Sequence, residues 1–464
     1  MSALHLSPPP ASHTLATARR TAFCAGLLAL ACTALQAAGR CDDGVAPELA
    51  RADAAAAGSD DAPRLQLQAL VGAGLARSQA VGAARLLAEA AQADTEEARA
   101  AQAVQAGVGA SLGPAHSDAA GYTRSAALQG QATINVSQLL FDGGRSDKLV
   151  GWRRLLAEAA LQSALNVREQ LALNTVVLAL ERHRYGVQLL VYEQYARTMR
   201  CLVDALQATV AADRGRASEL VQASKSLAQV ELSRADAQSQ QRQIEVRLRR
   251  LVGDAPLAFD GLPYQLRTMP ELQALLAQAE RANEIAQLDA QAAAQAQYAD
   301  AVQAGGKPQL SWVLSGSRVG AAGGSLSEAR GGNVTLGLSL NLPLLSPGVA
   351  PATDAARRRA SAALAQRDDA LDARRYRITE MHEQSRASVE RAERVRGVLQ
   401  SSEQVRDATF QQWQQLGRRS LFDVIGAESE HYGLRLQYVN ALHDAQQLNA
   451  NLIALGRGIE PWLR

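Results

Sequence analysis

The chain has 464 residues and a formal net charge of +2, and 47% of its residues are hydrophobic although only 4% are aromatic. This composition excludes a disordered chain and a collagen-like fibre, and four cysteines are too few for a scaffold held by disulfides. The first 38 residues contain Arg19 and Arg20 and no acid, so the remaining chain has no net charge. A nucleic-acid-binding protein would need a basic surface, which disfavours that class.

The N-terminus has the pattern of an export signal. Arg19 and Arg20 precede a short apolar segment over 21–35, and small residues follow at 37–38. We therefore expect a cleavable signal peptide over 1–38 and a flexible tail over 39–63. A membrane anchor is the alternative, but the apolar segment is shorter than the roughly 20 residues that span a bilayer.

The cysteines leave two questions open. Lipidation of Cys32 is an alternative fate of the N-terminus, although its surroundings match a lipidation motif poorly. The pairing of Cys41 and Cys201 does not follow from the sequence, and two unpaired thiols are the simplest interpretation.

Two long stretches lack proline, one between Pro114 and Pro256 and one between Pro351 and Pro461. Both are rich in Ala, Leu, Gln, Arg and Glu, which favour helices. The segment 143–213 would extend about 105 Å as a single helix, too long for a compact globule. The expected helices are 65–106, 143–213, 217–252, 271–304, 351–415 and 419–455.

Apolar residues in these helices recur at alternating steps of four and three, for example from Tyr185 to Val210 and from Leu434 to Leu455. This spacing is typical of helices that pack as coiled coils. In each half, two shorter helices together match the length of one long helix. We therefore predict a mainly α protein, with a small β part, whose helices form a long coiled-coil α-barrel.

Short stretches with a period of two lie between the first two helices of each half. The clearest is 333–342, the stretch at 108–112 is the weakest, and hairpin loops are expected at 113–127 and 320–332. The alternation predicts transmembrane β-strands, with a soluble half-buried sheet as the alternative. The expected lipid-facing residues are Ala132, Ile134, Val136, Leu310, Trp312, Leu314, Val334, Leu336, Leu338 and Leu340.

Four such strands cannot close a barrel, because the smallest single-chain barrels have eight. Open strand edges in lipid would leave backbone groups without hydrogen bonds. We therefore predict a homotrimer with a 12-stranded barrel.

The two halves share one plan. Leu140–Gly144 corresponds to Leu344–Gly348, and Gly253 corresponds to Gly456. We therefore expect two structural repeats, over 64–256 and 257–457, followed by a C-terminal tail at 458–464.

Three motifs add a resemblance to a known family: Leu139–Arg145 after a strand, Lys307–Leu310 before one, and Gly417–Glu428 between two helices. With these motifs, residues 64–457 resemble the TolC-like outer membrane efflux protein family. The resemblance implies a trimeric channel with a barrel in the outer membrane and a helical tunnel in the periplasm. It also implies a periplasmic adaptor and an inner-membrane ABC exporter or RND pump as partners, and no enzymatic activity.

The resemblance places the channel entrance at the turn between the last two helices. It maps Gly417, Arg419 and Asp423 onto entrance positions, with Asp423 in a ring of carboxylates and Arg419 in a latch. Gly426 stands where the family often has a second Asp, which predicts a wider or less cation-selective constriction. A capping box at Asp423 and a solvated Arg419 are the simpler interpretations. Gly215 and Gly417 are expected in the tip turns.

The Gly417–Glu428 motif favours an exit duct for type I protein secretion, with multidrug efflux as the alternative. A periplasmic coiled-coil adaptor or scaffold is the alternative from another class. The sequence shows no Walker motif, nucleophile elbow or zinc signature. Four of the seven histidines are scattered over the expected helices without metal-ligand spacing, and we expect no metal and no cofactor; the four are His183, His382, His431 and His443.

Overall fold

A computed structural model describes residues 61–117, 125–255, 266, 268–322 and 331–464. The expected signal peptide and residues 39–60 of the expected tail lie outside the described residues. The contacts divide the described chain into two compact units. The first unit contains Tyr185–Gln240 and Val395–Val439, and the second contains the other described residues.

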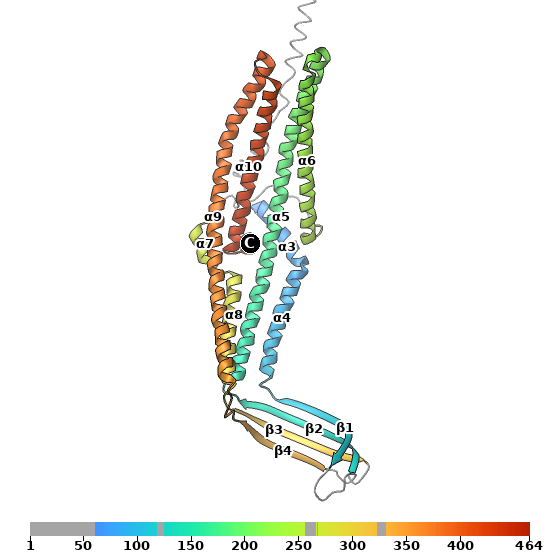
Figure 1. Ribbon diagram of the computed structural model, residues 1–464, viewed down its shortest axis with the longest axis vertical. Coiled ribbons are helices and arrows are strands. Elements are labelled where there is room, and N and C mark those ends of the chain that lie inside the picture. Colours follow the sequence, from blue (N-terminus) through green and yellow to red (C-terminus); the bar gives the residue numbers. More distant parts are fainter. Residues whose placement is uncertain (1–60, 118–124, 256–265, 267, 323–330) are drawn as a thin grey trace, which may run out of the picture. The chain divides into compact units, whose positions relative to one another are not determined.

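Helices make up most of both units (Figure 1). The two longest are α5 and α9, of 68 residues each. Among the described residues, none of the helices combines the length and the apolar character needed to cross a bilayer. The helices are α3 (Asp61–Arg77), α4 (Gln79–Ala100), α5 (Arg145–Ala212), α6 (Ala217–Val252), α7 (Leu272–Ala279), α8 (Asn283–Ala304), α9 (Val349–Leu416), α10 (Leu421–Leu455) and α11 (Ile459–Leu463).

The two halves of the chain repeat the same order of elements with nearly the same lengths. Helices α4 and α8 have 22 residues each, α5 and α9 have 68 each, and α6 and α10 have 36 and 35. The repeat inferred from the sequence is therefore present in the structure.

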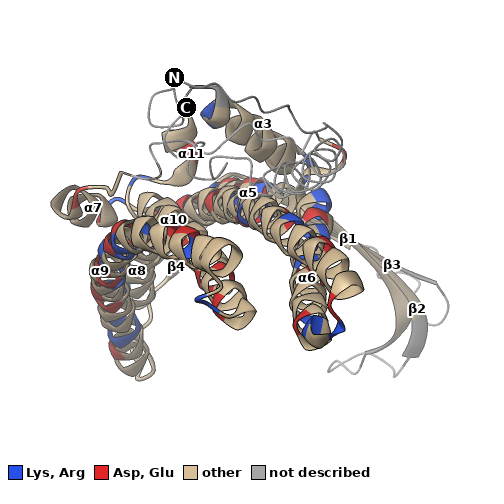
Figure 2. Ribbon diagram, turned by 90° about the horizontal axis from the view of Figure 1, so that it is seen from above, with Lys and Arg blue, Asp and Glu red and all other residues tan. Residues whose placement is uncertain are grey.

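Charges of both signs alternate along α9 (Figure 2). Several pairs lie one turn apart, such as Arg394 with Glu390 at 3.3 Å and Arg386 with Glu383 at 2.7 Å. Pairs of this kind each stabilise an exposed helix face by a few tenths of a kcal/mol, roughly 0.2–0.5.

Two of the expected helices are each divided in two. The segment 65–106 covers most of α3 and all of α4, which are separated at Ser78, whose hydroxyl accepts a hydrogen bond from the Val81 amide at 3.3 Å. Helix α3 begins at Asp61, within the expected tail, and residues 105–106 belong to a strand. A serine that caps a helix in this way favours a new helix start over continuation. The segment 271–304 contains α7 and α8, separated by residues 280–282.

The second unit contains one antiparallel sheet in the order β1-β2-β3-β4, drawn as neighbouring arrows in Figure 1. Its strands are β1 (Gln105–Ser117), β2 (Ser125–Phe141), β3 (Gln309–Ala322) and β4 (Gly331–Asn341). The strands continue into the segments expected to be loops at 113–127 and 320–332. Within the described chain, β1 and β4 each pair on one side only and form the edges of the sheet.

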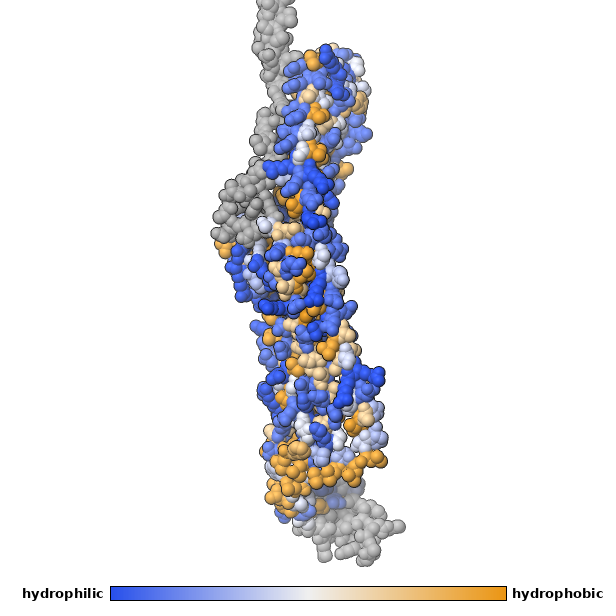
Figure 3. All heavy atoms as spheres, turned by 90° about the vertical axis from the view of Figure 1, so that its left-hand side faces the viewer, coloured by the Kyte–Doolittle hydropathy of each residue, from blue (hydrophilic) through white to orange (hydrophobic). Residues whose placement is uncertain are grey.

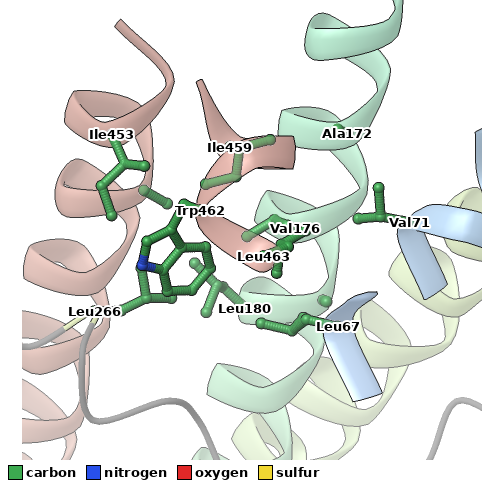
Figure 4. Packing of buried hydrophobic residues seen from close by; sticks show 12 residues of the cluster. Leu67, Val71, Ala172, Val176, Leu180, Leu266, Ile453, Ile459, Trp462 and Leu463 are labelled. Carbon is green, nitrogen blue, oxygen red and sulfur yellow. The ribbon is translucent and has the colours of Figure 1, made fainter. Parts of the chain in front are cut away.

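The C-terminal residues are part of the core of the second unit, so the expectation of a tail at 458–464 is wrong. Helix α11 buries Ile459, Trp462 and Leu463, and Trp462 is only 4% exposed. They pack against Val176 and Leu180 of α5 (Figure 4), in a cluster that also contains Leu67, Val71, Leu266 and Ile453.

The start of α11 is fixed by a carboxylate from a distant segment. Glu169 of α5 accepts hydrogen bonds from the backbone amides of Ile459 and Glu460. Burial raises the pKa of Glu169, although these two amides act in the opposite direction. Gly458 precedes the helix with φ of +95°, and a Cβ there would lie 3.1 Å from a Glu169 oxygen.

The core of the first unit joins residues of α5, α6 and α10. Several of the expected seam residues are buried in it, including Met199, Val203 and Leu206. They contact Leu421 and Val424 of α10 in the same cluster. The alternating four-and-three spacing therefore identified the packed side of α5 correctly.

The buried indole of Trp462 provides a test of the core role of α11. We expect Trp462→Ala to destabilise the second unit by about 3–5 kcal/mol, because the vacated volume cannot fully collapse. Thermal unfolding followed by circular dichroism measures the effect. Tyr376→Ala, at an aromatic residue that is 78% exposed on α9, is the control and is expected to change stability by less than about 0.5 kcal/mol. Equal effects in the two variants would contradict a core role for α11.

Candidate functional site

The turn between α9 and α10 and the first residues of α10, all in the first unit, contain the predicted entrance residues. Gly417 follows α9 with φ of +58°, a backbone conformation that favours glycine. Ser420 and Asp423 then form a reciprocal capping box. The Asp423 amide donates to the Ser420 hydroxyl at 3.2 Å, and the Ser420 amide donates to the Asp423 carboxylate at 3.0 Å. Asp423 therefore caps α10, as the simpler interpretation predicted. This role is compatible with a place in a ring of carboxylates.

The capped carboxylate remains in contact with solvent. Hydrogen bonds from the amide and hydroxyl of Ser420 lower the pKa of Asp423, and the positive charge of Arg419 lowers it further. Gly426 lies one turn later on the same exposed side of α10. A Cβ at Gly426 would meet no atom within 4 Å. This side of α10 therefore presents a fixed negative charge followed by an open position.

The other tip residues have local partners. The Arg419 guanidinium donates to the Gln412 side chain at 3.2 Å, so its described contact lies on the preceding helix. Gly215 lies in the short 3₁₀ turn Arg214–Arg216 between α5 and α6. Its amide donates to the Asp213 side chain at 2.9 Å, and a Cβ would approach that acceptor oxygen to 3.1 Å, which favours glycine at this position.

A buried polar layer joins α10 to α5 within the first unit. Arg435 is only 2% exposed; its guanidinium donates to Gln194 and lies 4.9 Å from the ring centre of Tyr432. Tyr432 stacks on Tyr195 at 4.5 Å, and its hydroxyl lies 3.0 Å from that of Thr198. No direct signal in the sequence pointed to this layer, because Arg435 lies one position away from the apolar series that starts at Leu434.

The register of the sheet brings the predicted lipid-facing residues onto one face in rows that cross the strands. Ile134 pairs with Gly316, which pairs with Val334, and Val136 pairs with Leu314, which pairs with Leu336. Trp312 lies between Gln138 and Leu338, and its indole donates to the Gln138 side chain at 3.1 Å. The sequence alternation therefore assigned the residues of this face correctly.

The apolar face is uncovered in the described chain. Val334 is 80% exposed and Leu338 is 71% exposed, and every residue of β4 is exposed. The exposed leucines continue into the segment after β4 with Leu344 and Leu345. Figure 3 shows hydrophobic side chains gathered at the sheet end of the second unit. A continuous apolar surface of this kind marks a contact with lipid or protein.

The opposite face of the sheet is mostly polar or small. Asn135 pairs with Ser315, which pairs with Thr335, and Thr133 pairs with Ser317. The sheet therefore has one apolar and one hydrophilic face. In transmembrane barrels these two sides meet lipid and water, respectively.

The described residues hold no group of three or more histidine, cysteine or acidic side chains that would fit a metal ion. His183 and His443 stack with their ring centres 5.3 Å apart, and His431 packs edge-on against Tyr432. Cys201 is disulfide-bonded, so the expectation of an unpaired thiol is wrong for this residue. Cys32 and Cys41 lie outside the described residues.

Comparison with solved structures finds the same fold in bacterial outer membrane channels. CusC, described as forming a transmembrane channel, has a TM-score of 0.73 and 18% identity over 84% of this chain and 92% of its own. The outer-membrane channel OprN has a TM-score of 0.72 and 18% identity over 85% and 91%. The outer membrane protein VceC of Vibrio cholerae has a TM-score of 0.72 and 22% identity over 85% and 97%.

These likenesses cover nearly the whole described chain and confirm, at the level of the fold, the resemblance drawn from the sequence motifs. No protein-family model matches the sequence, and no curated protein matches it either.

The capping box at the start of α10 provides a local test. We expect Ser420→Ala to destabilise the first turn of α10 by about 1 kcal/mol, because the Asp423 amide loses its acceptor. Hydrogen exchange of the amides at the start of α10 measures the effect, with roughly fivefold faster exchange expected. Ser401→Ala, at an exposed serine inside α9, is the control and leaves these amides unchanged. Unchanged exchange in Ser420→Ala would contradict the cap.

Proposed function

We propose that this protein is a passive channel of the outer membrane, an exit duct that functions as a homotrimer with its helices in the periplasm. The observation that carries the proposal is the sheet, whose apolar side chains share one face while mostly polar or small ones share the other, with β4 exposed along its whole length. The fold shared with outer membrane channels supports it.

The sheet edges support the proposed trimer. Strands β1 and β4 pair on one side only within the described chain. In lipid, each unpaired backbone group would cost several kcal/mol, roughly 4–8 by transfer to hydrocarbon. Pairing β1 of one copy with β4 of the next removes every such edge after three copies and gives twelve strands. A barrel of this size encloses an aqueous lumen.

The energy for export would come from partners, because the sequence has no nucleotide-binding motif. A periplasmic adaptor and an inner-membrane ABC exporter or RND pump would complete the system, and the cleavable signal peptide would direct the chain to the periplasm. Opening would separate the helices at the α9–α10 turn when these partners bind.

The motif Gly417–Glu428 favours protein cargo and a type I secretion system, and small-molecule efflux is the second candidate. Deletion of the gene separates the two. Loss of a secreted protein from the medium would support the first, and greater drug sensitivity with unchanged secretion would support the second.

A coiled-coil adaptor or scaffold in the periplasm would explain the long helices but not the amphipathic sheet. Native mass spectrometry of the detergent-extracted protein tests this alternative. A mass of three chains would support the channel. A monomer that stays soluble without detergent would contradict the channel and support the scaffold.

The two faces of β4 allow a matched test of the lipid contact. We expect Leu338→Arg to reduce the amount of membrane-inserted trimer, because an arginine facing lipid near the bilayer centre costs about 2–4 kcal/mol. Ser339→Arg, on the opposite face of the same strand, should assemble normally. Native mass spectrometry and membrane fractionation measure both variants, and equal assembly would exclude lipid contact at Leu338.

The exposed carboxylate of Asp423 provides a test of the entrance. Three copies of Asp423 around a narrow axis would favour cations, so we expect Asp423→Asn to move the ratio of cation to anion permeability toward one. Reversal potentials in planar bilayers under a salt gradient measure the ratio. Asp369→Asn, at an exposed aspartate on α9, is the control. The same change in both variants would mean that Asp423 does not line the conducting path.

A further inference from the structure

A cavity of about 520 Å³ lies in the second unit where α10 ends and α11 begins. Its walls come from α5, the α7–α8 connection, α9 and the turn at 456–458. Cavities of this size accommodate small organic ligands. Neither the proposed channel nor the entrance residues assign it a role.

Four guanidinium groups line this cavity, from Arg281, Arg374, Arg377 and Arg457. Arg374 is held in place: it donates to the Leu455 carbonyl at 2.7 and 3.0 Å and to the Glu284 carboxylate at 2.9 Å. The side chains of the other three form no ion pair or hydrogen bond within the described part of the chain. The site therefore contains three guanidinium groups that are available to a ligand.

The two carboxylates that line the cavity are already engaged. Glu284 pairs with Arg374, and Glu169 accepts the amide hydrogen bonds at the start of α11. No further acidic side chain lines the cavity. Four guanidinium groups thus face two carboxylates, and the excess of positive charge favours an anion.

The rest of the lining combines amide side chains, such as Gln170 and Asn451, with an apolar part. Leu173, Met381 and Ala454 line the cavity from three helices. The turn at Gly456 is closely packed, since a Cβ there would lie 2.6 Å from a Leu275 methyl group. A ligand with an apolar body beside its charged group would fit this lining, and Met381 can adapt to its shape.

We infer that this cavity binds a small organic anion, whose carboxylate or phosphate oxygens accept hydrogen bonds from Arg281, Arg377 and Arg457. The planar guanidinium group matches both kinds of oxyanion with two parallel hydrogen bonds. Apolar side chains on the facing helices contact the body of the ligand. The site does not depend on the channel function.

Isothermal titration calorimetry of the full mature protein in detergent tests this inference, with citrate and phenyl phosphate as probes at constant ionic strength. We expect saturable binding of at least one probe, and the stronger probe identifies the preferred oxyanion. The double variant Arg377→Gln/Arg457→Gln should bind at least tenfold more weakly. Arg359→Gln, at an exposed arginine elsewhere on α9, should bind like the unmodified protein.

Arg377→Lys keeps the charge but loses the paired donors, and it should weaken binding less than the double variant does. It also provides a readout if the double variant does not fold. Absence of saturable binding for both probes, or equal affinity in all variants, would overturn the inference. If the protein conducts ions but binds neither probe, the binding site is refuted and the proposed channel is unaffected. If it binds a probe but does not conduct, the channel is contradicted and the binding site is supported.

Discussion

The sheet of the second unit imposes the main constraint on the proposed assembly, because it has an apolar face and two strand edges that need partners. Its apolar rows, such as Val136, Leu314 and Leu336, lie on one face, where Leu336 is 72% exposed, and within the described chain its two outer strands each lack one neighbour. In water the apolar face would remain uncovered, and in lipid the strand edges would remain unpaired. The proposed closure with other copies inside a bilayer would satisfy both requirements.

The two halves reach the same elements with different local contacts. In the first half, Asp142 is buried and accepts hydrogen bonds from the amides of Gly144 and Ser146 at the start of α5. In the second half Ser346 takes the place of Asp142, and the Val349 amide donates to its carbonyl as the Arg145 amide donates to that of Asp142 in the first half. The difference between the halves therefore lies in the side chain at this position. The helix lengths therefore repeat although the residues of the preceding turns differ, since any hydrogen-bond acceptor that pairs with the first free backbone amides can start a helix.

Patterns with a regular period were predicted well. The alternation over 333–342 identified the face of β4, and the four-and-three spacing identified buried Met199 and Val203 on α5. The capping box at Ser420 was predicted too, because its two residues are three apart. These signals are local, so the residues that generate them are also the residues that interact.

The sequence by itself therefore determined the long helices, the faces of the sheet and the repeated order of elements, because hydrophobic period and helix propensity act within a few residues. Only the tertiary structure decided the places where distant segments meet. Helix α11 is held by Glu169, Arg435 is satisfied by Gln194, and Arg281 and Arg457 line the same cavity as Arg377. Each of these depends on a partner far away in the chain, and no periodicity in the sequence encodes that partner.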